Sequence, residues 1–131
     1  MYTLGHDFKP ANIHAGGLRY HGAGMIISQL IKDGYMHGVD IPQSESFKAG
    51  MLFARTEGII PAPESCHAIA ATIREAMKAK EAGEAKVILF CLSGHGLIDM
   101  PSYESYINGD LHDYAVSDDE IKKFLATVPE V

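Results

Sequence analysis

This sequence lacks the features that mark several specialised classes of protein. No apolar run approaches the roughly 18 residues that cross a bilayer, and no charged segment followed by an apolar one stands at the N-terminus, so we expect neither a membrane span nor a secretory leader. Cys66 and Cys91 are too few for a disulfide framework, and both lie in apolar patterns, where thiols are usually buried and inert. We therefore expect a cytoplasmic protein.

The charges and histidines exclude further classes. The net charge is −6 and no basic stripe is present, which argues against a nucleic-acid surface and against binding to an anionic membrane. His6, His14 and His21 are eight and seven residues apart, and none of the seven histidines belongs to a compact ligand pair such as His-x-x-x-His. We expect no metal site, and small molecules as partners.

What is present suits one globular domain. An apolar fraction of 47% is enough to build a core, and no internal repeat divides the 131 residues, so we expect a single domain over residues 1–131. The first nineteen residues have neither a helical nor a strand period and are predicted to be loop. Apolar residues at helical spacing, bounded by serine or glycine, predict helices over residues 20–35, 44–58, 64–83, 103–107 and 117–125.

The uninterrupted apolar run at residues 87–92 predicts a strand that is buried on both faces. Helical patterns surround this run, and a second short strand is expected near residues 39–41, so the predicted fold class is α/β, with helices packed on a small, mostly parallel sheet. Only two or three strands are visible in the sequence, which is few for a sheet with helices on both faces.

Ser93 stands at the end of this predicted strand, and ligands of parallel sheets bind beyond the carboxyl ends of the strands. Gly94 and Gly96 flank His95 and would let the backbone approach a ligand closely, while the Ser93 hydroxyl could donate or accept a hydrogen bond. An ordinary turn at a strand end also fits. The pattern lacks the first glycine of a nucleophile elbow, and Asp99 stands where the third glycine of a dinucleotide fingerprint belongs.

Three separated motifs together resemble one known family. Residues 57–62 read Glu-Gly-Ile-Ile-Pro-Ala, residues 92–96 read Leu-Ser-Gly-His-Gly, and the opening part contains Thr-Leu-Gly-His-Asp-Phe at 3–8 and His-Ala-Gly-Gly-Leu-Arg-Tyr-His-Gly at 14–22. In this order and spacing they resemble the tryptophan synthase beta chain family, in particular its second, divergent branch. The resemblance runs across nearly the whole chain but covers only the carboxyl-terminal third or so of such an enzyme.

The resemblance implies part of a fold type II pyridoxal phosphate enzyme, a lyase that joins L-serine and indole to give tryptophan. In that family the lysine that forms the Schiff base, and the glycine- and serine-rich loop that holds the cofactor phosphate, lie upstream of the matched region. No lysine of this chain stands in a plausible cofactor pocket. We therefore expect no catalytic residue here, no covalently bound cofactor and no activity from this chain alone.

The resemblance assigns what remains to the pyridine-ring side of the cofactor site. Ser93, followed by Gly94, corresponds to the family serine that hydrogen-bonds the pyridine nitrogen, and Glu57 corresponds to the carboxylate beside the ring. Glu57 could also be a solvated residue in the last turn of a helix, although the helix dipole disfavours a negative charge there. Asp7 matches the family acid that meets the substrate hydroxyl, or it simply bonds its own backbone in a turn.

Two hypotheses remain open. In the first, the chain is a carboxyl-terminal piece of a tryptophan synthase beta-like enzyme that is active only when an amino-terminal partner segment supplies the lysine and the phosphate loop. In the second, it is a stand-alone domain without catalysis that binds a small molecule or another protein. The first hypothesis implies uncovered apolar surface, which promotes self-association, so we expect a homo-oligomer.

Overall fold

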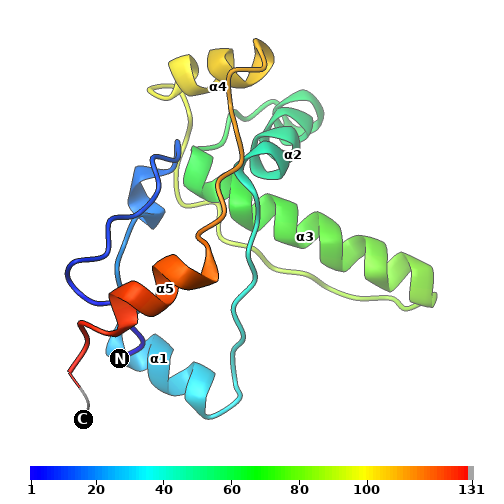
Figure 1. Cartoon of the computed structure of the whole chain (residues 1–131). Coiled ribbons are helices and arrows are strands. Elements are labelled where there is room, and N and C mark those ends of the chain that lie inside the picture. Colours follow the sequence, from blue (N-terminus) through cyan, green and yellow to red (C-terminus); the bar gives the residue numbers. More distant parts are fainter. Residues whose placement is uncertain (130–131) are drawn as a thin grey trace. The chain divides into compact units, whose positions relative to one another are not determined.

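The computed structural model describes residues 1–129 (Figure 1). A short 3-10 helix, Gly16–Leu18, is followed by helices α1 (Met25–Lys32), α2 (Gln43–Glu57), α3 (Pro63–Ala82), α4 (Met100–Ile107) and α5 (Asp118–Leu125). The internal contacts divide the chain into two compact units. The first unit comprises residues 1–13, residues 17–40 and the chain from Tyr114 onward, and the second unit comprises residues 14–16 and 41–113.

The predicted helices are all present, and their ends follow the sequence signals closely. Gly58 and Gly83 end α2 and α3 in the left-handed region, with φ of 71° and 67°, which glycine adopts without a steric penalty. Ser117 begins α5 with a full capping box, because its hydroxyl accepts from the Glu120 N–H while the Glu120 carboxylate accepts from the Ser117 N–H. The largest difference is in α1, which starts at Met25 instead of near residue 20.

The start of α2 differs from the prediction in an informative way. Ser44 was expected to cap this helix, but the residue at the cap position is Pro42, and Ser44 lies in the first turn. The capping oxygens come from Asp113, whose carboxylate accepts from the Ser44 backbone N–H at 2.9 Å and from the Ser44 hydroxyl at 2.5 Å. A residue distant in sequence therefore satisfies a helix end that local sequence alone leaves open.

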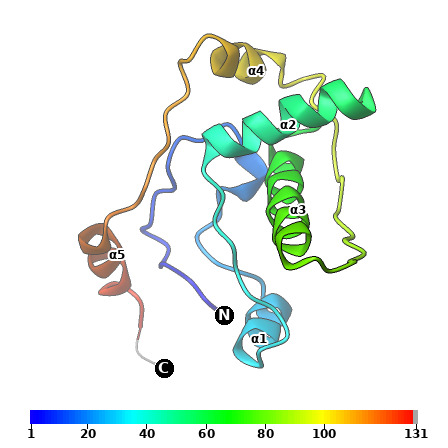
Figure 2. The ribbon, with the colours of Figure 1, turned by 90° about the vertical axis from the view of Figure 1, so that its right-hand side faces the viewer.

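The core of the second unit lies where α2, α3 and α4 meet. Figures 1 and 2 show α2 against the first turns of α3, with the extended chain after Gly83 running back along α3. Phe47 of α2 packs edge-on against Tyr103 of α4, with ring centroids 5.1 Å apart, and Cys66 of α3 completes this buried cluster. Gly50 allows the close approach of the two long helices, because a Cβ there would lie 2.4 Å from the Cys66 sulfur.

The predicted parallel sheet is wrong for the part of the chain that the structure describes. Residues 87–92 are extended but belong to no strand, residues 39–41 are irregular, and the only β-pairings among residues 1–129 are two isolated antiparallel bridges, Thr3 with Gly22 and Pro61 with His95. The physical reason is that an apolar run sets a preference for extended backbone, whereas a sheet also requires neighbouring strands, and no other segment among residues 1–129 pairs its backbone with this one.

The first unit is held by loop contacts and by one aromatic pair. Two hydrogen bonds of 2.9 Å flank the bridge between Thr3 and Gly22. They run from the Leu4 N–H to the His21 carbonyl and from the Ala23 N–H to the Tyr2 carbonyl. Phe8 packs edge-on against Phe124 of α5, with ring centroids 5.1 Å apart. Apart from the short 3-10 helix, the first nineteen residues are irregular except for the bridge at Thr3, which largely confirms the predicted loop.

Two sequence-based expectations about exposure can be compared with the structure. Cys66 is fully buried, as expected, whereas Cys91 is exposed, so the expectation that both thiols are buried is wrong for Cys91. Cys91 lies in the extended run, where alternate side chains face outward because the run is covered on one side only.

Within residues 1–129, no helix combines the length and the apolar character that crossing a membrane would require.

Candidate functional site

The structure brings together two of the motifs that sequence analysis singled out. The Ala62 N–H donates to the Gly94 carbonyl at 2.9 Å, and the Gly96 N–H donates to the Ile60 carbonyl at 2.8 Å, on either side of the bridge between Pro61 and His95. The Glu-Gly-Ile-Ile-Pro-Ala segment, which begins with the last residue of α2, therefore lies directly against the Leu-Ser-Gly-His-Gly segment. The two segments are separated by the whole of α3 in the sequence.

The glycines of the second motif are required by this contact. A Cβ on Gly96 would lie 2.4 Å from the Pro61 carbonyl oxygen and 3.0 Å from the ring of Tyr103, and a Cβ on Gly94 would lie 3.2 Å from the Cβ of Ala62. Sequence analysis attributed these glycines to the close approach of a ligand. Their observed role is the close approach of the two chain segments.

Ser93 lies beside the first turn of α3. Its hydroxyl oxygen is 3.4 Å from that of Ser65, a buried residue near the N-terminus of this helix, and either hydroxyl can be the donor. The Ser93 side chain is itself exposed, so its hydroxyl keeps further hydrogen-bonding capacity. The N-terminal end of α3 carries partial positive charge, which favours an orientation of the Ser93 hydroxyl in which an oxygen lone pair faces the helix.

The other predicted site residues lie elsewhere. Glu57 is the last residue of α2 and is exposed, and no hydrogen bond or ion pair joins its carboxylate to Ser93 or Gly94 within the described residues. Asp7 belongs to the first unit, is exposed, and has its carboxylate 3.0 Å from the imidazole of His6. Within the second unit the structure thus places Ser93 and Gly94 against the segment that begins with Glu57, but among residues 1–129 the Glu57 side chain makes no hydrogen bond to either.

Tyr103 is a residue of this region that sequence analysis missed. Its side chain is buried, its hydroxyl donates to the Pro61 carbonyl at 2.5 Å, and the Cys66 sulfur lies 3.3 Å from the same hydroxyl. Burial raises the pKa of Tyr103, and the hydrogen bond with Cys66 adds to that rise. Burial also raises the pKa of the Cys66 thiol, so both groups are neutral near pH 7 and act as hydrogen-bonding groups.

A signal for Tyr103 was available in the sequence. A tyrosine on the apolar side of a short helix, next to a segment rich in proline and glycine, needs a partner for its hydroxyl if it is buried. The carbonyl groups of an irregular segment are available as acceptors, because no regular secondary structure uses them. The sequence did not indicate that the acceptor would be the carbonyl of Pro61.

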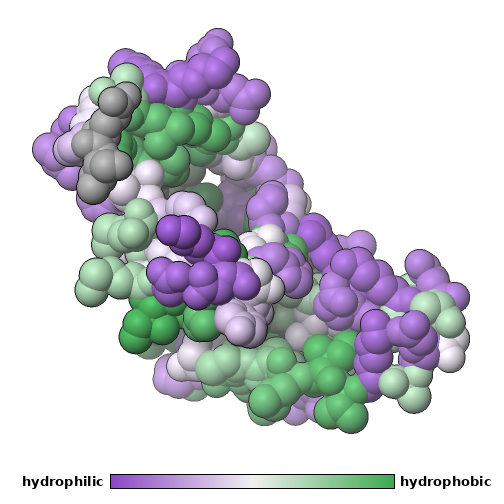
Figure 3. Space-filling view, turned by 90° about the horizontal axis from the view of Figure 1, so that it is seen from below, coloured by the Kyte–Doolittle hydropathy of each residue, from purple (hydrophilic) through white to green (hydrophobic). Residues whose placement is uncertain are grey.

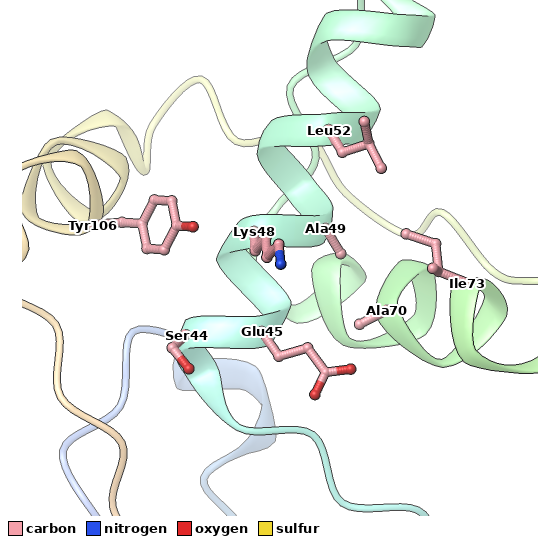
Figure 4. Close-up of a pocket in the computed structure, with 8 residues that line it drawn as sticks. All are labelled: Ser44, Glu45, Lys48, Ala49, Leu52, Ala70, Ile73 and Tyr106. Atoms are coloured by element: carbon pink, nitrogen blue, oxygen red, sulfur yellow. The ribbon is translucent and has the colours of Figure 1, made fainter. Parts of the chain in front are cut away.

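A separate cavity of about 580 Å³ lies at the surface of the second unit, between α2, α3 and α4 (Figure 4). Ala49 and Ala70 leave room between α2 and α3, and Glu45 at its edge is held by the guanidinium of Arg74, whose Nε donates at 2.6 Å. This hydrogen bond lowers the pKa of the Glu45 carboxyl. The full lining is Ser44, Glu45, Lys48, Ala49, Leu52, Ala70, Ile73 and Tyr106, which includes no residue of the two motifs.

The charged and sulfur-containing side chains give no sign of a metal centre. Among residues 1–129, no three histidine, cysteine, aspartate or glutamate side chains lie close enough together to hold an ion. In the joined motifs, the Ser93 hydroxyl keeps hydrogen-bonding capacity for a ligand, whereas the Gly94 carbonyl and the Gly96 N–H are used between the two segments.

No family model matches this chain, but individual curated proteins do. It is 59% identical over 113 residues to tryptophan synthase beta chain 2 of Aquifex aeolicus, covering 86% of this chain and 26% of that protein. It is 60% identical over 111 residues to the protein of the same name from Methanosarcina mazei, covering 85% and 25%. It is 55% identical over 114 residues to the tryptophan synthase beta chain of Thermococcus onnurineus, covering 87% and 26%. The chain spans about a quarter of the length of these relatives.

Proposed function

Because this chain matches a carboxyl-terminal fragment of the tryptophan synthase beta family, we propose that its residues 1–131 form one domain of a tryptophan synthase beta-like lyase of fold type II. The complete enzyme would use pyridoxal phosphate to join L-serine and indole, and would act in the cytoplasm. Identity of about 60% to proteins of that name carries the proposal. The contact between the two motif segments supports it, since both segments resemble parts of the family's cofactor site.

In this proposal the chain contributes the pyridine-ring side of the cofactor site. Ser93 would hydrogen-bond the ring nitrogen, Gly94 would line the ring, and Glu57 would stand beside it, while Asp7 would meet the hydroxyl of the serine substrate. The exposed Ser93 hydroxyl, with Ser65 as a neighbour at 3.4 Å, fits this role because it can still make another hydrogen bond. Pyridoxal phosphate supplies an electron sink, and a neutral hydroxyl partner leaves its ring nitrogen largely unprotonated.

The proposal also holds that this chain is inactive without an amino-terminal partner segment. Covalent catalysis with this cofactor needs a lysine amine whose pKa is lowered in a desolvated pocket. Every lysine of the chain is exposed, which supports a partner as the source of that amine. Uncovered apolar surface, including Val87 and Leu89, supports self-association of the chain as well.

Complementation tests this function. The chain is mixed with the upstream part of the Thermotoga maritima tryptophan synthase beta chain 2, pyridoxal phosphate, serine and indole, and tryptophan is measured. We expect tryptophan only from the complete mixture, and less from Ser93→Ala. Ser105→Ala is the matched control, because the Ser105 hydroxyl only bonds a carbonyl of its own helix at 3.1 Å. Equal activity of the two variants would count against the role of Ser93.

A cofactor titration tests the claim of incompleteness by itself. The purified chain is mixed with pyridoxal phosphate, and the absorbance bands of the free aldehyde and of a lysine aldimine are followed. We expect the free-aldehyde spectrum to persist apart from weak, non-specific reaction of surface lysines. A stable aldimine that maps to one lysine would show that this chain carries the anchoring amine.

A second candidate function is a stand-alone binding domain without catalysis. The cavity between α2, α3 and α4 favours it, since about 580 Å³ is within the range of small-molecule sites and its walls include Leu52 and Ile73. Failure of complementation, together with saturable binding of indole that Ala70→Leu abolishes, would favour this second function. Complementation without such binding would favour the first.

A further inference from the structure

The cavity between α2, α3 and α4 contains polar groups that are not used within the fold. Lys48 of α2 and Tyr106 of α4 both line it. Within residues 1–129, neither the Lys48 ammonium nor the Tyr106 hydroxyl makes a hydrogen bond or an ion pair. Figure 4 shows the Tyr106 hydroxyl pointing toward the side of α2 that carries Lys48. Two helices therefore each contribute a free hydrogen-bond donor to one cavity.

The carboxylates near these donors already have partners. The Glu45 carboxylate accepts from the guanidinium of Arg74, whose Nε donates at 2.6 Å. The Asp113 carboxylate accepts from the N–H and from the hydroxyl of Ser44, so the hydroxyl proton of Ser44 is used as well. Lys48 attracts Glu45 but forms no ion pair with it. The charged group that remains for a ligand is therefore a cation, which is complemented by an anionic acceptor.

The walls of the cavity are apolar and are held in place by the core. The ring of Tyr106 stacks on that of the buried Phe47, with centroids 5.7 Å apart and planes at 20°. Ala70 is buried and small, and Leu52 and Ile73 add branched apolar side chains. A volume of about 580 Å³ has room for a body of one or two rings.

Apolar surface by itself does not mark a site on this chain. Several large apolar side chains are exposed, among them Val87 and Ile98, and Figure 3 shows hydrophobic patches spread over one face of the molecule. The cavity differs from such surface because it is hollowed and because free donors stand at its apolar walls. A few polar groups that converge on an apolar hollow are typical of small-molecule sites.

We propose that this cavity binds a small carboxylate with an aromatic body. The Lys48 ammonium donates to the anionic group, the Tyr106 hydroxyl donates to its second oxygen, and the ring lies between Leu52 and Ile73. The inference rests on the cavity of the second candidate function and adds the class of ligand. It concerns a site apart from the two joined motifs and requires neither pyridoxal phosphate nor an upstream segment.

Three indole compounds that differ in charge test this inference. The chain contains no tryptophan, so the fluorescence anisotropy of an indole ring reports on the ligand alone. Indole-3-acetate, neutral indole and cationic tryptamine are each titrated with the full chain, without cofactor. We expect indole-3-acetate to bind about tenfold more tightly than indole, and tryptamine to bind more weakly than indole. The net charge of −6 would by itself favour tryptamine, so equal affinities or a preference for tryptamine would overturn the proposal.

Two substitutions and a control locate the binding. Lys48→Met removes the ammonium of an exposed side chain, and it should lower the affinity for indole-3-acetate about tenfold while leaving that for indole unchanged. Tyr106→Phe keeps the ring that stacks on Phe47 and should lower the affinity for indole-3-acetate about threefold. Lys80→Met is the matched control, because Lys80 is exposed on α3 and does not line the cavity.

The control separates a site from general attraction between charges. Equal losses in Lys48→Met and Lys80→Met would show that only the net charge matters, and would refute the site. The results are also independent of complementation. Failure to form tryptophan would count against the proposed enzyme alone, whereas loss of the preference for the anion in the unsubstituted chain would count against this site alone.

Discussion

At the scale of single residues, the joined motifs depend on the hydroxyl of Tyr103. The hydroxyl donates to the carbonyl of Pro61 and the ring lies against Gly96, so this one side chain contacts both joined segments. Within residues 1–129, no hydrogen bond joins Tyr103 to Ser93. The effect of Tyr103 on the proposed site is to hold in place the segment that contains Ser93, through Gly96 three residues further on.

We predict that Tyr103→Phe lowers the free energy of unfolding by about 1–3 kcal/mol, because it leaves the Pro61 carbonyl without its buried donor. Urea unfolding followed by circular dichroism measures this change. Tyr35→Phe is the matched control, since Tyr35 is 80% exposed, and it should change the free energy by less than about 0.5 kcal/mol. Equal effects of the two substitutions would show that the Tyr103 hydroxyl contributes nothing.

At the scale of elements, α2 is held at both of its ends by different means. Gly58 ends it locally through its own backbone conformation, whereas its start depends on Asp113 from beyond α4. Between these ends, Glu45 of α2 pairs with Arg74 of α3, so the contact between the two helices is polar at the surface and apolar beneath. The start of α2 is therefore the end most sensitive to a change in a distant residue.

The Asp113 cap predicts a specific dependence on pH. Hydrogen bonds from the side chain and backbone of Ser44 lower the pKa of the Asp113 carboxyl. A pKa lowered in the folded state adds stability that is present above the unfolded value, about 3.9, and is lost as pH falls through the lower folded value. Asp113→Ala should cost about 1 kcal/mol at pH 7 and progressively less below about pH 4.

Unfolding by urea at a series of pH values measures this difference. Asp110→Ala is the control, because the Asp110 side chain makes no hydrogen bond or ion pair within the described residues. A difference between wild type and Asp113→Ala that stays constant down to acid pH would contradict the ionised cap. A difference that grows on acidification would mean that folding raises the pKa of the Asp113 carboxyl instead of lowering it.

At the scale of the whole molecule, net charge and exposed apolar surface affect self-association in opposite directions. Each copy carries a net charge of −6, which makes two copies repel at long range. The apolar run at residues 87–92 carries no charge, so its contribution to self-association is not weakened by salt. Association should therefore respond to salt through the net charge and not through ion pairs at the interface.

We predict that self-association strengthens as the salt concentration rises from about 0.01 M to about 0.15 M, over which the screening length falls from about 30 Å to about 8 Å. Sedimentation at the two salt concentrations measures the dissociation constant. Leu89→Lys removes exposed apolar surface, so it should weaken self-association at both salt concentrations. Association of the wild type that weakens with salt would point to an interface made of ion pairs.

Sequence reasoning predicted the helices well and the site in part. Apolar spacing and the residues at the ends were enough to place α2, α3 and α5, because helix hydrogen bonds are local. The two motifs were recognised separately, and their order suggested a shared site, but the hydrogen bonds of Ala62 and Gly96 appear only in three dimensions. Tyr103 and Asp113 were missed because each acts on a segment far away in the sequence.

The sequence by itself determined where helices form and the resemblance of three motifs to one family, since both depend on residues close together along the chain. Only the tertiary structure decided that residues 87–92 have no strand neighbour among residues 1–129, that Cys91 is exposed, and that the Ser93 hydroxyl lies beside Ser65 and forms no hydrogen bond with Glu57. The physical reason is that a strand is completed by a partner and a side chain is buried by its neighbours. Neither the partner nor the neighbours are specified within the segment itself.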